Sequence, residues 1–482
     1  MDRQDAERIY EAGREAVIAT LLQMDARIRE LEKIEQRVGE LEQRVARLTR
    51  NSTNSSKPPS SDPPSLKKPG TGKKPGKRKQ GGQPGHKGKK RELLPASEMD
   101  VIHDIFPQEC EHCRKLLAQT VLDPTRQPLR HQVVELPPIV PLKTEYRLHS
   151  LLCSCGRHTV ANVPKDVAGS SFGPRVHAAM AYLTAVHRVS RRGISEIMAT
   201  LFGIEISTGA VCEANNRVSK ACVPMVGAIK RYLHSATVLN IDETGWKNRG
   251  ARRYLWCFVA PLAVLFHVSE RRGAKVLKEI LGESFGGIIG SDDHSAYNCY
   301  HKHGLRQLCW AHLIRKFKAL RDDRSSPHAY CFARNMLKEV GTIFSCWHAF
   351  QNSGGSRDQL WLDTQPMRDR MHDYCEMFLG STDPLVITRA KRTLANWEHL
   401  FTFLQYEGVE PTNNIAERAI RPSVQWRKLC FGSQSDTGER FTERMLSVIG
   451  TCRLHLVNPF DFLTKVVSAA FSGRQSLPDL LR

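Results

Sequence analysis

One segment of the sequence cannot contribute to a folded core, and it divides the chain into parts that must fold separately. Residues 51–92 consist mostly of Pro, Ser, Lys and Gly and show no helix or strand periodicity. A segment of this composition has too little apolar surface to offset the entropy lost on folding. We therefore expect a disordered linker over residues 51–94, with a helical part before it and several domains after it.

The same segment carries about half of the chain's excess charge. The 482 residues have a formal net charge of +21, and residues 51–91 hold 12 Lys and Arg against one acid. Basic segments of this density usually contact a polyanion, most commonly nucleic acid. The basic residues expected to contact DNA here are Lys73, Lys74, Lys77, Arg78 and Lys79. The alternative is a linker that only keeps the chain soluble.

The sequence does not fit the membrane or the secreted class of protein. Its longest uncharged apolar run, residues 255–268, has 14 residues and contains Pro261, so it is too short to span a bilayer. The N-terminus is charged and lacks the apolar stretch of a signal peptide. We therefore expect a cytoplasmic protein whose 14 cysteines are reduced.

Residues 5–50 have the pattern of one long helix. Two sets of apolar residues each repeat every seven positions, namely Leu31, Val38 and Val45, and Ile34, Leu41 and Leu48. Interleaved, these sets form the apolar seam of a coiled coil, with Glu and Arg around it. We expect an oligomerisation helix over residues 1–50. The alternative is an amphipathic helix that packs on its own chain.

Two close pairs of cysteines predict a metal site within residues 95–168. The pairs, spaced CxxC and CxC, are Cys110 with Cys113 and Cys153 with Cys155. The sequence between them alternates as strands do, and a hairpin that joined the pairs would create a tetrahedral thiolate site for structural Zn²⁺. His112 or His158 could replace one thiolate. The alternative is a small β module with free thiols.

Residues 169–234 have the composition of successive helices. Two candidate helices are separated by a short glycine turn, and a third begins after Ser207 and Thr208, which are good helix caps. A helix, a tight turn and a second helix is the pattern of a helix-turn-helix DNA-binding domain. Ordinary helical bundles share this pattern, so they remain the alternative.

Two aspartates stand at the ends of strands predicted to be buried within residues 235–309. Asp242 follows an apolar run that begins at Val238, and Asp292 and Asp293 follow the run GGIIGS. Burying a carboxylate is unfavourable unless it is paired or binds a cation, and two on neighbouring strands would repel each other. A divalent ion between them removes the repulsion, and Mg²⁺ prefers oxygen ligands.

A third carboxylate follows a long helical region that spans residues 310–410. In the stretch PTNNIAERAIRP, Asn413 or Asn414 can cap a short helix that carries Glu417 in an early turn. We expect residues 411–482 to return the chain to the strands. Glu417 would then complete a site for two metal ions.

Several motifs, in this order, resemble those of transposases of the insertion-sequence-66 family. They are DET, SDxxxAY, CWAH with RKF, and NNxAERAIRP with WRK, and the segments NSSKPPSSD, GGQPGHKG and the cysteine pairs extend the resemblance to nearly the whole chain. Those enzymes are similar to the retroviral-integrase superfamily, with an RNase H-like fold and a triad of two Asp and one Glu. The resemblance implies a multidomain α+β protein. Its RNase H-like α/β core would contain an α-helical insertion and follow a coiled-coil helix, a zinc-binding β module and a helix-turn-helix-like helical domain.

The resemblance also assigns roles to individual residues. The catalytic triad, which would hold two Mg²⁺ (or Mn²⁺) ions, would be Asp242, Asp292 and Glu417. Asp293 is the close competitor of Asp292, whereas Glu243 should point to the opposite face of its strand. The 124 residues between Asp292 and Glu417 are too many for a simple connection and imply the insertion.

Other residues are expected to support this site or to contact DNA. The basic residues near Glu417 that would hold phosphates are Arg418, Arg421, Arg427 and Lys428, with a solvated basic face as the alternative. The expected supporting residues are Asn414, Cys309 and His312. We interpret the CxxH motif as a structural support or DNA contact rather than a metal site, because two ligands alone do not hold zinc. The alternative is a buried helix with an incidental histidine.

These expectations predict a nucleoid-associated bacterial transposase that cleaves element ends and transfers strands. Its partners would be double-stranded DNA, further copies of the chain, and possible small accessory proteins of the same element. Two other functions fit parts of the sequence. One is a non-catalytic DNA-binding protein, and the other is a metal-dependent nuclease without strand transfer.

Overall fold

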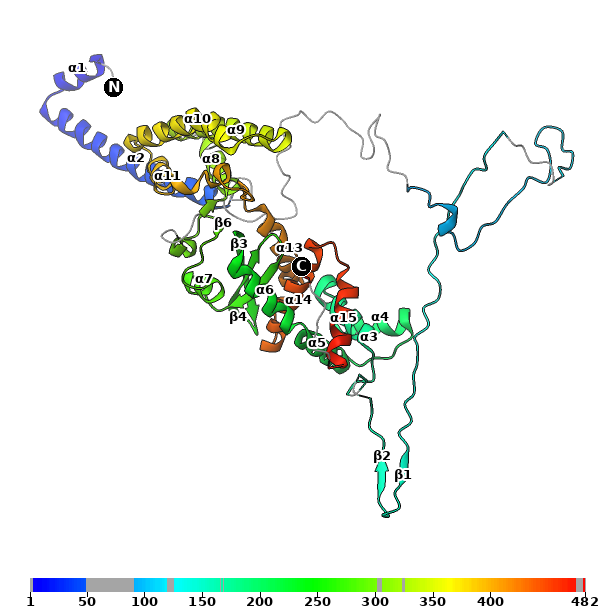
Figure 1. The fold of residues 1–482 in the computed structure, drawn as a ribbon. Coiled ribbons are helices and arrows are strands. Elements are labelled where there is room, and N and C mark those ends of the chain that lie inside the picture. Colours follow the sequence, from blue (N-terminus) through cyan, green and yellow to red (C-terminus); the bar gives the residue numbers. More distant parts are fainter. Residues whose placement is uncertain are drawn as a thin grey trace. The chain divides into compact units, whose positions relative to one another are not determined.

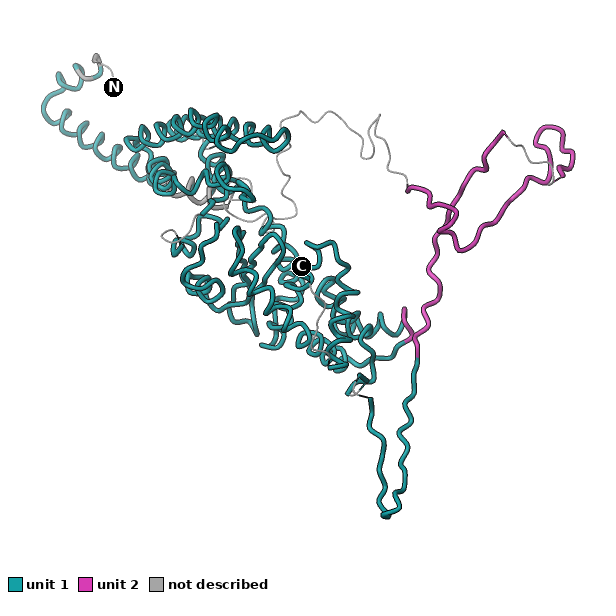
Figure 2. Tube along the Cα trace, in the orientation of Figure 1, with its two compact units in different colours: residues 1–66, 143–200, 204–482 teal, residues 67–142, 201–203 magenta. Residues whose placement is uncertain are grey.

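The structure is a computed structural model that describes residues 3–48, 91–118, 125–164, 166–167, 169–300, 306–322, 326–473 and 480–481. The basic residues expected to contact DNA in the linker, Lys73 to Lys79, lie outside these ranges. The chain divides into two units, residues 1–66, 143–200 and 204–482, and residues 67–142 and 201–203 (Figure 2). Each unit is considered by itself.

The N-terminal part forms two helices rather than the single helix expected from the sequence. Helices α1 (Arg3–Glu11) and α2 (Arg14–Leu48) are separated at Gly13, whose φ of 97° is accessible mainly to glycine. The apolar seam lies on α2, where Leu31, Ile34 and Val38 each expose about half of their surface. Nothing in the described chain covers this stripe, and the coiled coil stays a prediction.

A five-stranded mixed sheet organises the larger unit (Figure 1). Its strands are β3 (Val238–Asn248), β4 (Ala251–Val259), β5 (Val264–Ser269), β6 (Ile288–Ser291) and β7 (Arg306–Leu308). They lie in the order β5-β4-β3-β6-β7; the first three are antiparallel, and β6 and β7 run parallel to β3. The return of β6 beside β3 is a crossover, made through helix α7 (Ala274–Leu281).

Helices pack on both faces of the sheet. On one face, α7 and α6 (Val223–Ser235) form a core with β3 and β4 around Ile241, Trp256 and Phe258. On the other face, α13 (Asn414–Cys430), α14 (Asp436–Leu454) and α15 (Pro459–Phe471) pack together with α3 (Pro174–His187) and α5 (Thr208–Ala221). The second half of β4, Leu255–Val259, is therefore buried on both sides, which explains its continuous apolar sequence.

Helix α14 also protects the edge strand β5. The side chains of Thr451, Ser447 and Glu443 accept hydrogen bonds from the backbone amides of β5, with donor–acceptor distances between 2.6 and 3.1 Å. An exposed strand edge presents unpaired amides to other chains. Polar residues on one face of α14 remove that exposure here.

Residues 310–405 form a second core of helices. Helices α8 (Trp310–Asp322), α9 (Pro327–Ser353), α10 (Arg357–Met377), α11 (Pro384–Ala395) and α12 (Thr402–Gln405) enclose Phe332, Met371 and Phe403. Val238 and Ile288, at the starts of β3 and β6, belong to the same cluster of buried residues. The helical region, which follows β7 and precedes α13 in the sequence, therefore packs against the end of the sheet where β3 and β6 begin.

The region before the sheet differs in detail from the sequence expectation. Helix α4 (Arg191–Phe202) follows α3, and the helix expected from Thr208 onward is broken into α5 and α6, with Pro224 in the first turn of α6. Among the described residues of 95–168, only β1 (Ser150–Leu152) and β2 (His158–Val160) form strands, so the β module is smaller than predicted. No helix in the described ranges is both long and apolar enough to cross a membrane.

Candidate active site

Asp242 lies in the middle of β3 rather than at its end as expected, and Asp292 directly follows the end of β6. In the parallel pairing of β3 with β6, Asn240 is opposite Gly290, and each aspartate comes two residues later in its strand direction. Side chains alternate along strands, so residues at equivalent register positions share a face. Beyond Ser291, β6 ends while β3 continues beside β4 alone. The two carboxylates therefore project where β3 loses its parallel neighbour.

The charges of the neighbouring acids act on the carboxylate of Asp242. Burial raises the pKa of Asp242 well above its usual range, and the charges of Glu243, Asp292 and Glu417 raise it further. The carboxylate of Asp242 also accepts a hydrogen bond from the amide of Glu243, at 2.9 Å. This bond lowers the pKa of Asp242, but burial and the neighbouring charges outweigh it. A divalent cation would offset this repulsion directly.

Asn413 brings the helix of Glu417 back to the strand of Asp242. Its side-chain Nδ2 donates to the carbonyl of Ile241 at 2.7 Å, and its backbone amide donates to Sγ of Cys309 at 3.1 Å. The carbonyl of Asn413 accepts from the amide of Glu417 at 3.1 Å, in the first turn of α13. Asn413 therefore connects the residue before Asp242, the end of β7 and the third carboxylate.

The structure gives Asn413, rather than Asn414, this supporting position. Asn413 is the residue before the first turn of α13 and exposes only 2% of its surface, whereas Asn414 is exposed. Its side chain makes no helix-capping hydrogen bond, because it bonds to β3 instead. Sequence patterns identified a cap here but could not show that the amide bonds to a strand 172 positions away.

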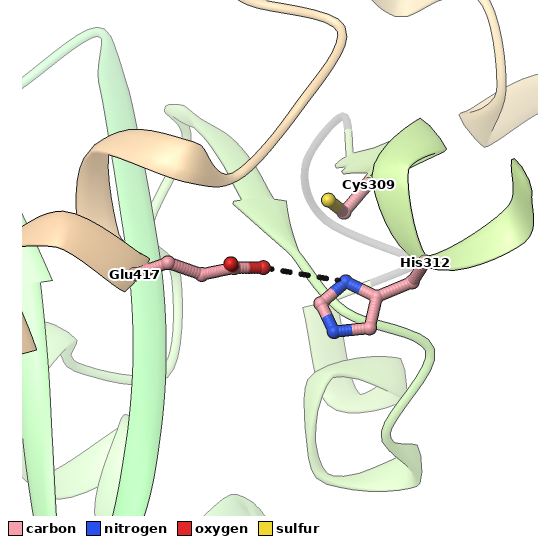
Figure 3. Close-up of side chains that lie close together, drawn as sticks. All are labelled: Cys309, His312 and Glu417. Atoms are coloured by element: carbon pink, nitrogen blue, oxygen red, sulfur yellow. Dashed lines mark ion pairs between the residues drawn. The ribbon is translucent and has the colours of Figure 1, made fainter. Parts of the chain in front are cut away.

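Cys309 and His312 stand directly beside Glu417 (Figure 3). The carboxylate Oε1 of Glu417 lies 3.6 Å from Nδ1 of His312 and 3.8 Å from the guanidinium of Arg315. Burial raises the pKa of Glu417, the charge of Arg315 lowers it, and the charge of Asp292 raises it. Neither Oε1 of Glu417 nor Nδ1 of His312 has a hydrogen-bond partner among the described residues. A buried carboxylate oxygen without a partner fits a metal-binding role.

The potential ligand atoms of Cys309, His312 and Glu417 all lie within 4.8 Å of one another. Burial raises the pKa of the Cys309 thiol to about 11, and its sulfur already accepts the amide of Asn413. Burial and the charge of Arg315 lower the pKa of His312 to about 4, so its ring is neutral. These contacts make Cys309 and His312 supports of the Glu417 position.

The two competing carboxylates have other partners. Glu243 accepts from Arg272 at 2.9 Å and from the hydroxyl of Tyr297 at 2.5 Å. Asp293 accepts from Lys316 at 2.9 Å and lies 3.4 Å from the guanidinium of Arg392. A carboxylate already neutralised by a cation is a poorer metal ligand than one facing other carboxylates. The contacts therefore favour Asp292 over Asp293.

Arg306 is a supporting residue that sequence reasoning missed. It exposes 2% of its surface in β7, and its guanidinium donates to the hydroxyl of Ser291, the side chain of Asn298 and the carbonyl of Asp292. It thereby fixes the turn that carries the second carboxylate. No clear sequence signal marks this residue, because β7 reads Arg-Gln-Leu and only the structure shows that Arg306 is buried with its partners.

The basic residues of α13 have different surroundings. Arg418 and Arg421 are exposed on the helix, and Lys428 is exposed near its end. Arg427 instead donates to the hydroxyl of Thr244, at 3.2 Å, and to the carbonyl of Gly245 in β3. Arg427 thus holds α13 against the strand of Asp242.

The cysteine pairs lie in different units, and the distance between the two pairs is therefore not determined. Backbone amides of Cys113 and His112 lower the pKa of the Cys110 thiol, and the amide of Cys155 lowers that of Cys153. Each pair therefore lies in a turn whose amides stabilise a thiolate, as a zinc ligand requires. The shared zinc site stays a prediction.

Comparison with known proteins gives two family matches and several relatives. Residues 169–440 match the Transposase IS66 family, and residues 4–92 match a family of unknown function. Three uncharacterized proteins of Sinorhizobium fredii (strain NBRC 101917 / NGR234) are similar to the chain. Uncharacterized protein y4hP is 25% identical over 55% of this chain and 54% of its own length. Uncharacterized protein y4jD is 27% identical over 58% and 59%, and y4qI is 26% identical over 46% and 44%. The chain spans about half the length of these relatives.

Proposed function

The chain belongs to the Transposase IS66 family, and from this premise we propose that it is a DNA transposase that cleaves element ends and transfers the cut strands. The observation that carries the proposal is the convergence of Asp242, Asp292 and Glu417. Asp242 lies within β3, Asp292 directly follows the neighbouring strand β6, and Asn413 returns the helix of Glu417 to β3. Their charges raise the pKa of Asp242.

The arrangement of the sheet supports an RNase H-like core. Three antiparallel strands followed by two parallel ones, in the order β5-β4-β3-β6-β7, place the first strand in the centre. The helical region between β7 and α13 is then an insertion in that core. Helices α3 to α5 and the cysteine pairs supply the proposed DNA-binding domain and zinc module. The seam of α2 supplies the proposed contact between copies of the chain.

The three carboxylates form an oxygen-donor set suited to Mg²⁺ or Mn²⁺. Divalent ions held by these residues would supply activation of water or a 3′-hydroxyl and stabilisation of the leaving oxygen. Asp242 would bind from within β3, Asp292 from the turn directly after β6, and Glu417 from the first turn of α13. The exposed Arg418 and Arg421 are placed on the same helix to hold DNA phosphates.

The chemistry consists of two phosphoryl transfers. In the first, water attacks a phosphorus at the element end, the 3′-oxygen leaves, and a free 3′-hydroxyl results. In the second, that hydroxyl attacks a phosphorus of target DNA and displaces its 3′-oxygen, so one bond forms for each bond broken. The chain's residues orient the strand and exclude competing geometries, and no covalent enzyme intermediate is required.

The decisive experiment compares cleavage and joining on a DNA duplex that carries the borders of the gene, together with a supercoiled target. The full chain should give joined products with Mg²⁺. Asp242→Asn and Glu417→Gln should lose cleavage by several orders of magnitude while DNA binding remains. Glu376→Gln, which changes an exposed acid of α10, is the matched control.

The alternatives give different results. Hydrolysis without joined products would identify a nuclease without strand transfer. Binding with no metal-dependent cleavage by the unchanged chain would identify a non-catalytic DNA-binding protein. Near-normal cleavage by Glu417→Gln would overturn the assignment of the third carboxylate.

A further inference from the structure

A cluster of three cations surrounds a single carboxylate beside the candidate active site. Lys316 of α8 and Arg392 of α11 both approach the same oxygen of Asp293, Oδ2, at 2.9 and 3.4 Å. Arg389 lies one turn before Arg392 on α11 and interacts with Asp293 electrostatically. The cluster therefore carries a formal charge of +3 against −1.

The cluster is partly buried, which makes its excess charge costly. The side chains of Lys316 and Asp293 expose 17% and 15% of their surface. Burial lowers the pKa of Lys316 and of Arg389, and the neighbouring cations lower both further. For Asp293, burial acts to raise the pKa, but Lys316 and Arg392 outweigh it and lower the pKa. One acid is fully used, and excess positive charge remains.

The guanidinium of Arg389 has unused donors. Its Nε and one terminal nitrogen are buried and find no hydrogen-bond partner in the described ranges. A small pocket is lined by Asp293, Arg389, Arg392, Thr393 and Asn396, together with leucines. Unpaired buried donors cost more when they are charged. Arg392, which lines this pocket, exposes 54% of its side chain, so an anion in solution can contact Arg392.

A purely structural explanation accounts for only part of these observations. The pair between Asp293 and Lys316 joins the turn after β6 to the helical insertion and would be sufficient for docking. It does not explain two further arginines around the same acid, or the unpaired nitrogens of Arg389. An anionic ligand bound by Arg392 would offset the excess positive charge of the cluster, because a guanidinium offers parallel donors that match a phosphate.

We propose that Arg389, Arg392 and Lys316 form a binding site for a backbone phosphate of the DNA strand that passes the active site. The inference rests on the proposed function, because DNA must be the substrate. Asp293 directly follows Asp292, so the cluster lies within a few nucleotides of the phosphate to be cleaved. The helical insertion would thereby hold the substrate strand, in addition to separating Glu417 from the aspartates. Asp293 acts as the counter-ion that keeps the three cations together before DNA binds.

The test is the binding of fluorescent duplex DNA by the full chain, measured over a range of salt concentrations with Ca²⁺ in place of Mg²⁺ so that the strand is not cut. Each phosphate neutralised by a protein contributes about 0.9 to the slope of log K against log salt. Arg392→Gln should lower this slope by about 1 and weaken binding at low salt. Arg334→Gln, which changes an exposed arginine of α9 in the same helical region, should leave both unchanged.

A second measurement identifies the phosphate itself. Neutral methylphosphonate linkages placed one at a time along the strand should weaken binding by the full chain at one position. At that position they should have no further effect on Arg392→Gln. Inorganic phosphate should not compete at concentrations comparable to those of DNA; strong competition would identify a small-anion site and overturn the proposal.

Folding and catalysis are kept separate from this result. Because the side chain of Arg392 is 54% exposed, the Arg392→Gln variant should unfold at the same temperature as the unchanged chain. Arg389→Gln provides a second variant, in which the salt slope should fall by the same amount. Equal slopes for Arg392→Gln, Arg389→Gln and Arg334→Gln would overturn the proposal and leave the cluster a structural contact. If the proposed transposase function is wrong, the unchanged chain will not cleave DNA, and this result does not depend on the salt slopes of the variants.

Discussion

Replacing Asp242 by asparagine should greatly reduce the rise in melting temperature that Mg²⁺ produces. It should change the melting temperature of the metal-free protein much less. Burial and the charges of Glu243, Asp292 and Glu417 raise the pKa of Asp242, so its ionised form opposes folding when no cation is bound. Asparagine has nearly the same size and removes the charge. The metal-free variant should therefore be at least as stable as the unchanged chain at neutral pH.

The magnitude follows from linkage between binding and folding. A ligand at 100 times its dissociation constant stabilises the folded state by about 2.7 kcal/mol. Because 1 kcal/mol corresponds to roughly 2–4 °C for a domain of about 150–250 residues, Mg²⁺ at this saturation should raise the melting temperature of the unchanged chain by about 5–10 °C. Asp242→Asn loses a charged ligand and should show only a small part of this rise.

The assay is thermal unfolding, followed by circular dichroism, in chelator and in increasing Mg²⁺. Asp363→Asn is the matched control, because Asp363 is an exposed acid of α10 that accepts a hydrogen bond from Gln359. It should keep the full response to Mg²⁺. An equal Mg²⁺ response in Asp242→Asn, or a metal-free variant several degrees less stable than the unchanged chain, would refute the reasoning.

Four further predictions follow from individual contacts. Asp292→Asn should abolish cleavage without lowering the metal-free melting temperature, whereas Asp293→Asn should lower that temperature because two cations lose their shared partner; the reverse pattern in the same two assays would make Asp293 the metal ligand. Asn413→Ala leaves a buried strand carbonyl without its donor, so it should cost about 1–3 kcal/mol in urea unfolding and about 10²-fold in cleavage rate, and an unchanged rate would contradict its positioning role. Cys110→Ser should lose bound zinc in elemental analysis yet retain the Mg²⁺-dependent rise in melting temperature, and undiminished zinc would exclude Cys110 as a ligand. Burial lowers the pKa of His177, so its stabilising contribution is present above the unfolded pKa of about 6.5 and is lost as pH falls through the folded value; urea midpoints of His177→Gln should depend less on pH between about 7.5 and about 5 than those of the unchanged chain.

The parts of the site that could be predicted are those with a local sequence signal. Asp242 and Asp292 follow apolar runs that form strands because their residues are buried, and a carboxylate after such a run is conspicuous. A hairpin and a helix separate the two runs, and a crossover connection of this kind favours a parallel return beside the first strand. The strand order and register come from the structure, because equivalent apolar runs fit several arrangements.

The parts that could not be predicted depend on contacts between distant residues. Asn413 bonds to residues 172 and 104 positions away, and Arg306 is a buried cation whose partners come from the turn after another strand. Neither the apolar periodicity of the sequence nor the spacing of its motifs predicts such long-range contacts. The break at Gly13 was equally hidden, because a single glycine is compatible with a continuous helix until its φ is known.

The helical region also determines where Glu417 lies. Its buried core includes Val238 of β3 and Ile288 of β6, so its helices pack directly on the two strands that carry the aspartates. The first residue of the region, Trp310, contacts the other end of the region. Its backbone amide donates to the carbonyl of Pro411, and its indole donates to the carbonyl of Leu400. Both ends of the region are therefore fixed beside β7, and the chain emerges at Asn413 within reach of Ile241. A long insertion places a distant carboxylate accurately because it is anchored where it leaves the sheet and where it returns.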